Sequence, residues 1–167
     1  MCILNIKGLR FYGRLNDDHL KALFKVANVL NKQDIKGIKG VYCIDGKKTI
    51  KDKYYSGGHY IQFTRINNNS CVSLEMKYAN GDKETIKVYN SPIIVINGDL
   101  CHTEYDFVFC LLHEIGHHIY NGFYTTDKQK EITAHLYAIE KIKKIYNIER
   151  IPVKPYLYLK EALELTI

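Results

Sequence analysis

Apolar residues recur at helical spacing close to the start of the chain. Within about residues 16–31 they stand three or four positions apart, at Leu20, Leu23, Phe24, Ala27 and Leu30. This period predicts an amphipathic helix, and Asn16 or Asp17 can cap its N-terminus. Gly37 and Gly40 then interrupt the pattern, so the helix is expected to end before them.

The pattern changes to strands and turns over residues 41–97. Short apolar or alternating runs predict strands at residues 41–44, 59–66, 71–78, 84–89 and 93–96. Asn80-Gly81 stands between the third and fourth of these runs and is a strong signal for a two-residue hairpin turn. The last run follows Pro92 and is apolar throughout.

Helical signals return for the rest of the chain, with helices expected at residues 103–120, 126–146 and 156–165. Thr103 with Asp106, and Thr126 with Gln129, place capping residues at the first two starts. The order helix, strands, helices predicts an α+β fold, with helices gathered on one face of an antiparallel-rich sheet. We expect a single domain over residues 1–167, built from the N-terminal helix at about 16–31, a β-rich middle at 41–97 and a helical part at 103–167.

Length and composition fit one globular domain. The chain has 167 residues, of which 46% are hydrophobic and 25% charged, which is enough to bury a core. Its net charge of +6 comes mostly from lysines spread along the sequence, so we expect no direct nucleic-acid binding. No apolar run approaches the roughly 18 residues of a membrane span, and the N-terminus lacks the pattern of a secretory signal. The expected location is the cytoplasm, with no membrane partner.

The chain contains five cysteines and no C-x-x-C pair. The odd number and the spacing predict reduced thiols rather than a disulfide framework. Cys101-His102 with Cys110 matches no common zinc spacing. We therefore expect the cysteines and His102 not to bind metal, and the thiols to be buried as small apolar groups.

A motif with defined chemistry lies within the helix expected at 103–120. His113-Glu114-Ile115-Gly116-His117 reads H-E-x-x-H. Residues four apart share one helical face, about one turn from each other, so both histidines can reach one cation. Glu114 is then placed to act on a water molecule beside the cation rather than to bind the metal itself. The apolar stretch Phe107–Leu112 seats this helix in the core, which disfavours the alternative of a solvated polar face.

A catalytic zinc usually takes three protein ligands, so the motif needs a third. Glu131 lies in the next expected helix, and two antiparallel helices joined by a short loop would bring it alongside the motif. Ala134 and Ala138 on its face, and Gly116 on the facing helix, would let the helices approach closely. The alternative is that Glu131 only provides a favourable negative charge near the start of its helix.

Other polar side chains near the motif have less defined roles. His118 points about 100° around the helix from His117, so we expect it at the surface or beside the site rather than on the metal. His135 lies one turn after Glu131 and either orients a ligand, contacts a developing oxyanion, or is an ordinary packed histidine. Three tyrosines are near enough in sequence to donate a phenol O–H to a transition state: Tyr120, Tyr124 and Tyr137.

These segments resemble the ImmA/IrrE family of zincin-like metallopeptidases, of the HExxH gluzincin type. The similar segments are Ile94–Asn97, the apolar stretch Phe107–Leu112, the motif with His118, and the segment from Glu131 to Ala138. Together they cover about residues 90–140. The resemblance implies a zincin-like fold with one zinc ion per chain.

By the same similarity, His113, His117 and Glu131 would hold the zinc and Glu114 would be the general base. The chain departs from the family at Thr133, where a second Glu is usual, and at His135, where Asn is usual. The apolar sequel of that helix is replaced by Lys141-Ile142-Lys143-Lys144, and the hairpin around Asn80-Gly81 has no match in the family core. Metal binding is expected to survive these departures from the family. The identity of the substrate does not follow from the resemblance.

The leading hypothesis is a zinc-dependent endopeptidase that cleaves a protein substrate. Family members are associated with cleavage of repressors beside a DNA-binding partner, so the substrate is expected to be a transcriptional regulator, although no helix-turn-helix segment is visible here. We expect the substrate to lie extended along an edge strand, either Ile93–Asn97 or the predicted hairpin. The alternatives are a non-catalytic zinc-containing protein that docks onto a partner, and a toxin-like proteolytic effector. An intact Glu114 argues against the docking protein, because a purely structural zinc site needs no base.

Overall fold

The structure, a computed structural model, describes residues 4–44, 57–62, 71–77, 82–101, 103–124 and 126–149. Within these ranges the fold is α+β. The strands are β1 (Leu4–Ile6), β2 (Leu9–Gly13), β3 (Val41–Ile44), β4 (Gly58–Ile61), β5 (Val72–Lys77), β6 (Lys83–Val88) and β7 (Ile93–Asn97). The helices are α1 (Asp17–Val29), α2 (Glu104–Ile119) and α3 (Asp127–Tyr146). The helix predicted at 156–165 and the turn at Asn80-Gly81 lie outside the described residues.

The main sheet is mixed, with the strand order β1-β2-β3-β7-β4. Its two outer pairs, β1–β2 and β4–β7, are antiparallel, whereas the central pairs β2–β3 and β3–β7 are parallel. The prediction of an antiparallel-rich sheet is therefore wrong for the sheet centre. Strands β2 and β3 are parallel because α1 lies between them in the chain. The helix returns the backbone to the end of the sheet at which β2 began, as a crossover between parallel strands requires.

The hairpin β1–β2 at the start of the chain was not predicted from the sequence. Its register pairs Leu4 with Phe11 and Ile6 with Leu9. Lys7 and Gly8 form the turn, with φ of 53° and 97°. Two successive residues with positive φ are what a tight hairpin turn of this kind needs, and Gly8 between two short apolar segments is the signal that could have revealed it.

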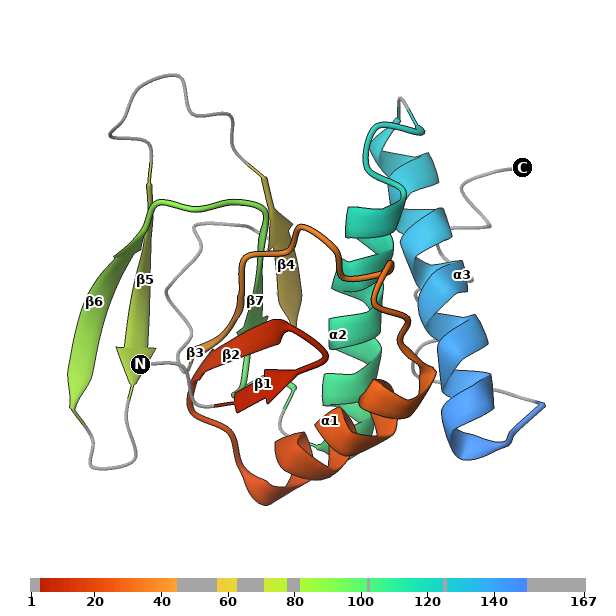
Figure 1. Ribbon diagram of the computed structural model, residues 1–167, viewed down its shortest axis with the longest axis horizontal. Helices are drawn as coiled ribbons and strands as arrows, with labels where there is room; N and C mark the ends of the chain where they lie inside the picture. Colours follow the sequence, from red (N-terminus) through yellow and green to blue (C-terminus); the bar gives the residue numbers. More distant parts are fainter. Residues whose placement is uncertain are drawn as a thin grey trace.

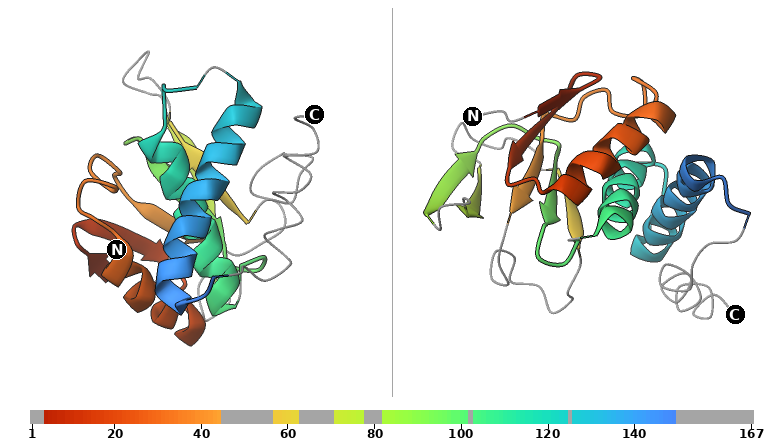
Figure 2. Two further views of the ribbon diagram at one scale, coloured as in Figure 1. Left: turned by 90° about the vertical axis from the view of Figure 1, so that its right-hand side faces the viewer. Right: turned by 90° about the horizontal axis from the view of Figure 1, so that it is seen from below.

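The main sheet lies between two layers, and both of its faces are covered. Figure 1 shows the hairpin β5–β6 on one side and the helices on the other, and the view from below in Figure 2 separates these layers. Along β7, Ile94 and Ile96 pack in the core that the helices cover, while Ile93 and Val95 pack in a second core with the hairpin. A strand that is buried on both faces needs an uninterrupted apolar run, as its sequence indicated.

The helix starts lie where the sequence predicted them. Asn16 caps α1 by accepting a hydrogen bond from the His19 backbone N–H at 2.7 Å. Thr103 caps α2 through the N–H of Asp106, and Thr126 caps α3 in the same way. These caps fix the start of α2 and α3, and therefore which residues of each helix face the other.

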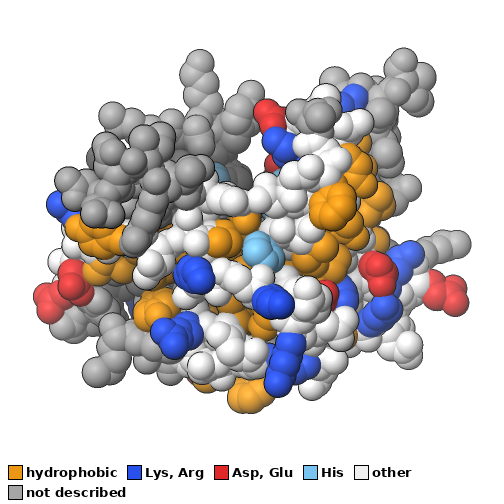
Figure 3. Space-filling view, turned by 45° about the horizontal axis from the view of Figure 1, so that its top comes forward, with side chains coloured by type: hydrophobic (Ala, Val, Ile, Leu, Met, Phe, Trp, Pro, Cys, Tyr) orange, Lys and Arg blue, Asp and Glu red, His pale blue; other side chains and the backbone are white. Residues whose placement is uncertain are grey.

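Basic side chains are spread over the face of the molecule that Figure 3 shows. In Figure 3 the Lys and Arg side chains stand apart from one another, among hydrophobic and uncharged groups, rather than in one stripe. No helix in the described part of the chain is long and apolar enough to cross a membrane.

A buried ion pair joins α3 to the segment after α1. Lys141 Nζ lies 3.2 Å from Asp34 Oδ2, and the Tyr137 hydroxyl donates to the same oxygen at 2.9 Å. The side chains of Lys141 and Asp34 are 10% and 17% exposed. Burial opposes ionisation of Asp34, but the hydrogen bonds from Tyr137, Asn31 and Lys141 lower its pKa below the usual value.

Replacing Asp34 with Ala should lower the free energy of unfolding by about 3–5 kcal/mol, because Lys141 would keep a buried charge without its carboxylate. Urea denaturation measures the loss. The matched control is Lys144→Ala, which removes the pair with Glu140 between side chains that are 60% and 62% exposed. The control should change stability by at most about 1 kcal/mol, and equal losses in both variants would contradict the role given to the buried pair.

Candidate metal centre

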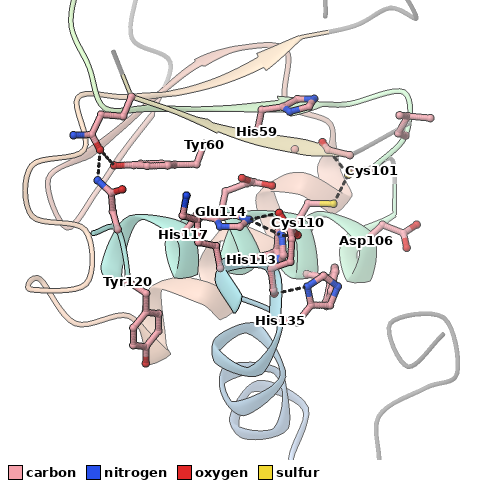
Figure 4. Close-up of a pocket in the computed structure, with 18 of the residues that line it drawn as sticks. His59, Tyr60, Cys101, Asp106, Cys110, His113, Glu114, His117, Tyr120 and His135 are labelled. Atoms are coloured by element: carbon pink, nitrogen blue, oxygen red, sulfur yellow. Dashed lines mark hydrogen bonds and ion pairs between the residues drawn. The ribbon is translucent and has the colours of Figure 1, made fainter. Parts of the chain in front are cut away.

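The motif residues of α2 lie between the sheet edge and α3. Figure 4 shows His113, Glu114 and His117 projecting from α2 into a pocket, with β4 on one side of them and α3 on the other. His113 is 9% exposed and Glu114 is 5% exposed, so both are buried. The pocket has a volume of about 910 Å³ and reaches from the start of β4 to the end of α2.

The structure brings the three predicted zinc ligands into mutual contact. His113 Nε2 and His117 Nε2 are 3.0 Å apart, and each lies 3.2 Å from a different carboxylate oxygen of Glu131, Oε2 for His113 and Oε1 for His117. The two imidazoles and the carboxylate therefore form a triangle of donor groups, in which each imidazole faces its own carboxylate oxygen.

Close packing of α2 against α3 is what places Glu131 opposite the two histidines. A Cβ added to Gly116 would lie 2.8 Å from Ala134 Cα and 3.0 Å from its carbonyl oxygen. Only glycine therefore fits between the helices at this point, as predicted from the small residues of the two faces. The acidic residue in the first turn of α3 is Asp127, so Glu131 lies beyond the turn in which a negative charge favours the helix start.

Replacing Gly116 with Val should separate α2 from α3 and lower the free energy of unfolding by about 1–3 kcal/mol, since the added atoms meet backbone rather than a flexible side chain. Zinc affinity should fall as well, because Glu131 would move away from the histidines. Urea denaturation and a zinc titration measure the two effects. Leu136→Val, at a position of α3 that is 52% exposed, controls for a β-branched residue in a helix and should change little.

The electrostatic surroundings of Glu131 favour its charged form. Burial by itself would raise the pKa of Glu131, but hydrogen bonds from His113 and His117 and their charges outweigh this and hold it well below the usual value. Its side chain is nevertheless 54% exposed, so the triangle of donor groups is open toward the solvent on one side. An open side leaves room for a water molecule or a substrate atom.

Glu114 faces the opposite wall of the pocket from Glu131. Burial raises the pKa of Glu114, against the lowering effects of His113 and His117. Its carboxylate accepts a hydrogen bond from the backbone of Tyr60 on β4. A Cβ at Gly58 would lie 2.9 Å from Glu114 Oε1, so the absent side chain of Gly58 makes room for the carboxylate.

His135 takes part in a second, overlapping set of donors. One ligand atom from each of His113, Glu131 and His135 lies within 4.8 Å of the others, so this group could also hold a metal ion. The ring nitrogen Nδ1 of His135 lies 3.0 Å from the Glu131 carbonyl oxygen, and burial together with His113 lowers the pKa of His135 to about 4. The contacts of the set with His117 are 3.0–3.2 Å long and involve both carboxylate oxygens of Glu131, whereas the set with His135 takes one ligand atom from each residue.

The imidazole of His135 packs edge-on against His113, with ring centroids 4.3 Å apart. His113 Nδ1 is buried and has no hydrogen-bond partner among the described residues. Through this ring contact His135 can restrict the orientation of the His113 ring, one of the roles that the sequence left open.

The three tyrosines named from the sequence are placed differently. Tyr120 lines the pocket at the end of α2. The ring of Tyr124 packs near Tyr120, with centroids 6.4 Å apart, and Tyr124 is 37% exposed. Tyr137 lies elsewhere: its hydroxyl is bound to Asp34, so its assignment to the site is wrong. Residue spacing alone could not show that this face of α3 turns toward α1.

Strand β4 contributes Tyr60 to the pocket, which the sequence did not indicate. Tyr60 reaches across the pocket and its hydroxyl lies 3.2 Å from His118 Nδ1, while His118 Nε2 lies 3.0 Å from the Lys36 carbonyl oxygen. Both nitrogens of His118 are thus engaged away from Glu131, in agreement with its prediction as a non-ligand. The Tyr60 hydroxyl also donates to Gln62, which Asn121 contacts from the turn after α2.

The expectation that Ile93–Asn97 forms an edge strand is wrong. This segment, β7, lies inside the sheet between β3 and β4, because β4 pairs with it from Gly58 to Ile61. The strand at the end of the sheet beside the pocket is β4. The Gly57-Gly58 pair before an alternating run signalled a strand there, but nothing in the local sequence says which strand it pairs with.

Comparison of the chain with models of known protein families, with curated proteins and with solved structures found no match. The resemblance to the ImmA/IrrE family therefore stays a prediction from the motif residues. What the chain does has to be argued from the geometry of the pocket.

Proposed function

We propose that this protein is a zinc-dependent endopeptidase with a zincin-like fold, similar to the ImmA/IrrE family. The observation that carries the proposal is the mutual contact of His113 Nε2, His117 Nε2 and the two carboxylate oxygens of Glu131, at 3.0–3.2 Å, next to the buried Glu114. A protein without a metal at this point would gain little from placing two imidazoles and a carboxylate so close together on packed helices.

The donor chemistry fits zinc. Two imidazole nitrogens and one carboxylate oxygen are ligands that zinc accepts, and a catalytic site needs three of them with one position left open. The exposed side of Glu131 provides that opening. When bound, the zinc ion would polarise the scissile carbonyl group and lower the pKa of a water molecule in the site.

Glu114 would be the group that moves the proton. Its carboxylate would accept a proton from the attacking water molecule and then pass it to the leaving amine. Burial raises the pKa of Glu114 above its usual value, and the Tyr60 backbone donates a hydrogen bond to the carboxylate and holds it in place. His135 and Tyr120 line the same pocket and are the nearest candidates to stabilise negative charge on the carbonyl oxygen.

The substrate would lie along β4, the end strand of the sheet beside the pocket. An extended peptide can add to such a strand through backbone hydrogen bonds. Gly58 and Tyr60 would then place the scissile bond near Glu114, because both residues contact its carboxylate. We propose a protein substrate, and by the family resemblance a transcriptional regulator in the cytoplasm.

Cleavage of a peptide library derived from digested cell protein tests the proposal. The zinc-loaded protein should create new N-termini, and removal of zinc with a chelator should abolish them. Re-addition of zinc should restore the same cleavage sites. Cleavage that persists in the chelator, or that the Glu114→Gln variant reproduces at full rate, would point to a contaminating protease and contradict the proposal.

A further inference from the structure

Two cysteines meet at the end of the pocket, one helical turn before the motif. Cys101 lies in the turn that follows β7, and Cys110 lies on α2, with their sulfur atoms 2.7 Å apart. Nonbonded heavy atoms usually rest about 3.5–4.0 Å apart, so the two sulfur atoms are in unusually close contact. Both residues line the pocket, and both appear in Figure 4.

The backbone of Cys101 is held from two directions. Its N–H donates to the Asn97 carbonyl oxygen at 2.9 Å. Its own carbonyl oxygen lies 2.8 Å from Nε2 of His19, a side chain that is 3% exposed and stacked on Phe107. These bonds keep the Cys101 sulfur beside Cys110 rather than leaving the contact to a mobile loop.

Gly57 lies directly over the two sulfur atoms. A Cβ at Gly57 would be 2.6 Å from Cys110 Sγ and closer still to Cys101 Sγ. The Cys101 thiol donates to the Gly57 carbonyl oxygen at 3.4 Å, and the same oxygen accepts the Asn97 N–H at 2.8 Å. The thiols therefore support the backbone where β4 begins, next to the contact of Gly58 with Glu114.

We propose that Cys101 and Cys110 form a modification site, a dithiol that a peroxide oxidises to an intramolecular disulfide. One sulfur attacks the peroxide, becomes a sulfenic acid and releases one water molecule. The second sulfur then attacks the sulfenic sulfur, forms the S–S bond and expels a second water molecule. The two thiols lose two electrons and two protons in all, hydrogen peroxide is reduced to two water molecules, and a small thiol reductant reverses the reaction by exchange.

The short distance between their sulfur atoms makes Cys101 and Cys110, rather than the other described thiols, the pair that we expect to be oxidised. Cys43 is buried in the sheet core, and Cys71 is half-buried. The hydrogen bond that Cys110 shares with Cys101, together with burial, raises the pKa of Cys110. In a reducing compartment such a bond would be transient and respond to oxidants, as intracellular disulfides generally do.

Hydrogen peroxide treatment of the full chain, followed by alkylation and mass spectrometry, tests the proposal. The peptide that spans both cysteines should lose about 2 Da and resist alkylation, since each thiol gives up its hydrogen. Cleavage at Glu104 or Asp106, between the two cysteines, should leave the fragments joined until a reductant is added. Closing this short loop should also raise the midpoint of thermal unfolding by about 5 °C.

Cys110→Ser tests whether the two sulfur atoms react with each other. It should form no disulfide, and Cys101 should instead be trapped by dimedone as the sulfenic acid. Cys43→Ser is the matched control and should oxidise like the wild type. If Cys101 and Cys110 stay fully alkylatable while Cys71 is oxidised, the proposal is wrong. None of these readouts needs zinc or peptidase activity, so the result is independent of the proposed function.

Discussion

Glu114→Gln should keep the fold and the zinc ion and lose nearly all peptide cleavage. The amide has the shape of the carboxylate and can occupy the same space beside Gly58, but it cannot accept a proton from the attacking water. General acid–base catalysis typically contributes about 10²–10⁴-fold, so kcat should fall by about that factor. Single-turnover cleavage of a peptide found in the library screen measures the loss.

The control for this variant is Glu140→Gln, which changes an exposed carboxylate of α3 that pairs only with Lys144 in the described contacts. It should cleave at the wild-type rate. If Glu114→Gln also cleaves at the wild-type rate, Glu114 is not the base. If wild type and variant both bind a partner without cutting it, the docking protein considered from the sequence becomes the better account.

Glu131→Ala and His117→Ala should each weaken zinc binding more than 100-fold. Loss of a residue that only supports a ligand typically costs about 10–100-fold in metal affinity, so loss of a ligand itself should exceed that. Competition with a chromogenic zinc chelator measures the affinities. Activity should disappear in parallel, in contrast to Glu114→Gln, which is expected to lose activity alone.

The variants His118→Asn and His135→Asn distinguish the zinc ligands from histidines that only lie near them. His118 contacts Tyr60 and Lys36 and lies outside the donor triangle, so its replacement should leave zinc affinity nearly unchanged. His135→Asn should weaken zinc binding by about 10–100-fold, as expected for a residue that orients the His113 ring. If His135→Asn loses zinc as completely as Glu131→Ala while His117→Ala retains it, the metal belongs to the set His113, Glu131 and His135 instead.

The sequence predicted best those features that rest on short-range signals. The caps at Asn16, Thr103 and Thr126 predicted the starts of all three described helices. The i, i+4 spacing of the motif predicted that two imidazoles would share one helical face. The approach of Glu131 also followed from sequence, because small residues on α2 and α3 imply close packing and Gly116 meets Ala134 at the contact.

What the sequence could not predict depends on long-range pairing. The parallel centre of the sheet follows from the crossover through α1, and the position of β4 at the sheet end follows from its pairing with β7. Tyr137 shows the same limit within one helix: its hydroxyl binds Asp34, far away in the chain, and not the pocket. Cys101 and Cys110 were expected to be unrelated buried thiols, and only the folded turn after β7 brings their sulfur atoms together.

X-ray absorption at the zinc edge of the wild-type protein, purified without chelators, tests the central claim most directly. We expect about one zinc ion per chain, with only nitrogen and oxygen neighbours at about 2.0–2.1 Å, supplied by His113, His117, Glu131 and solvent. Absence of zinc after such a purification, or a sulfur neighbour at about 2.3 Å, would contradict the account, because the site would then be empty or built from the cysteines.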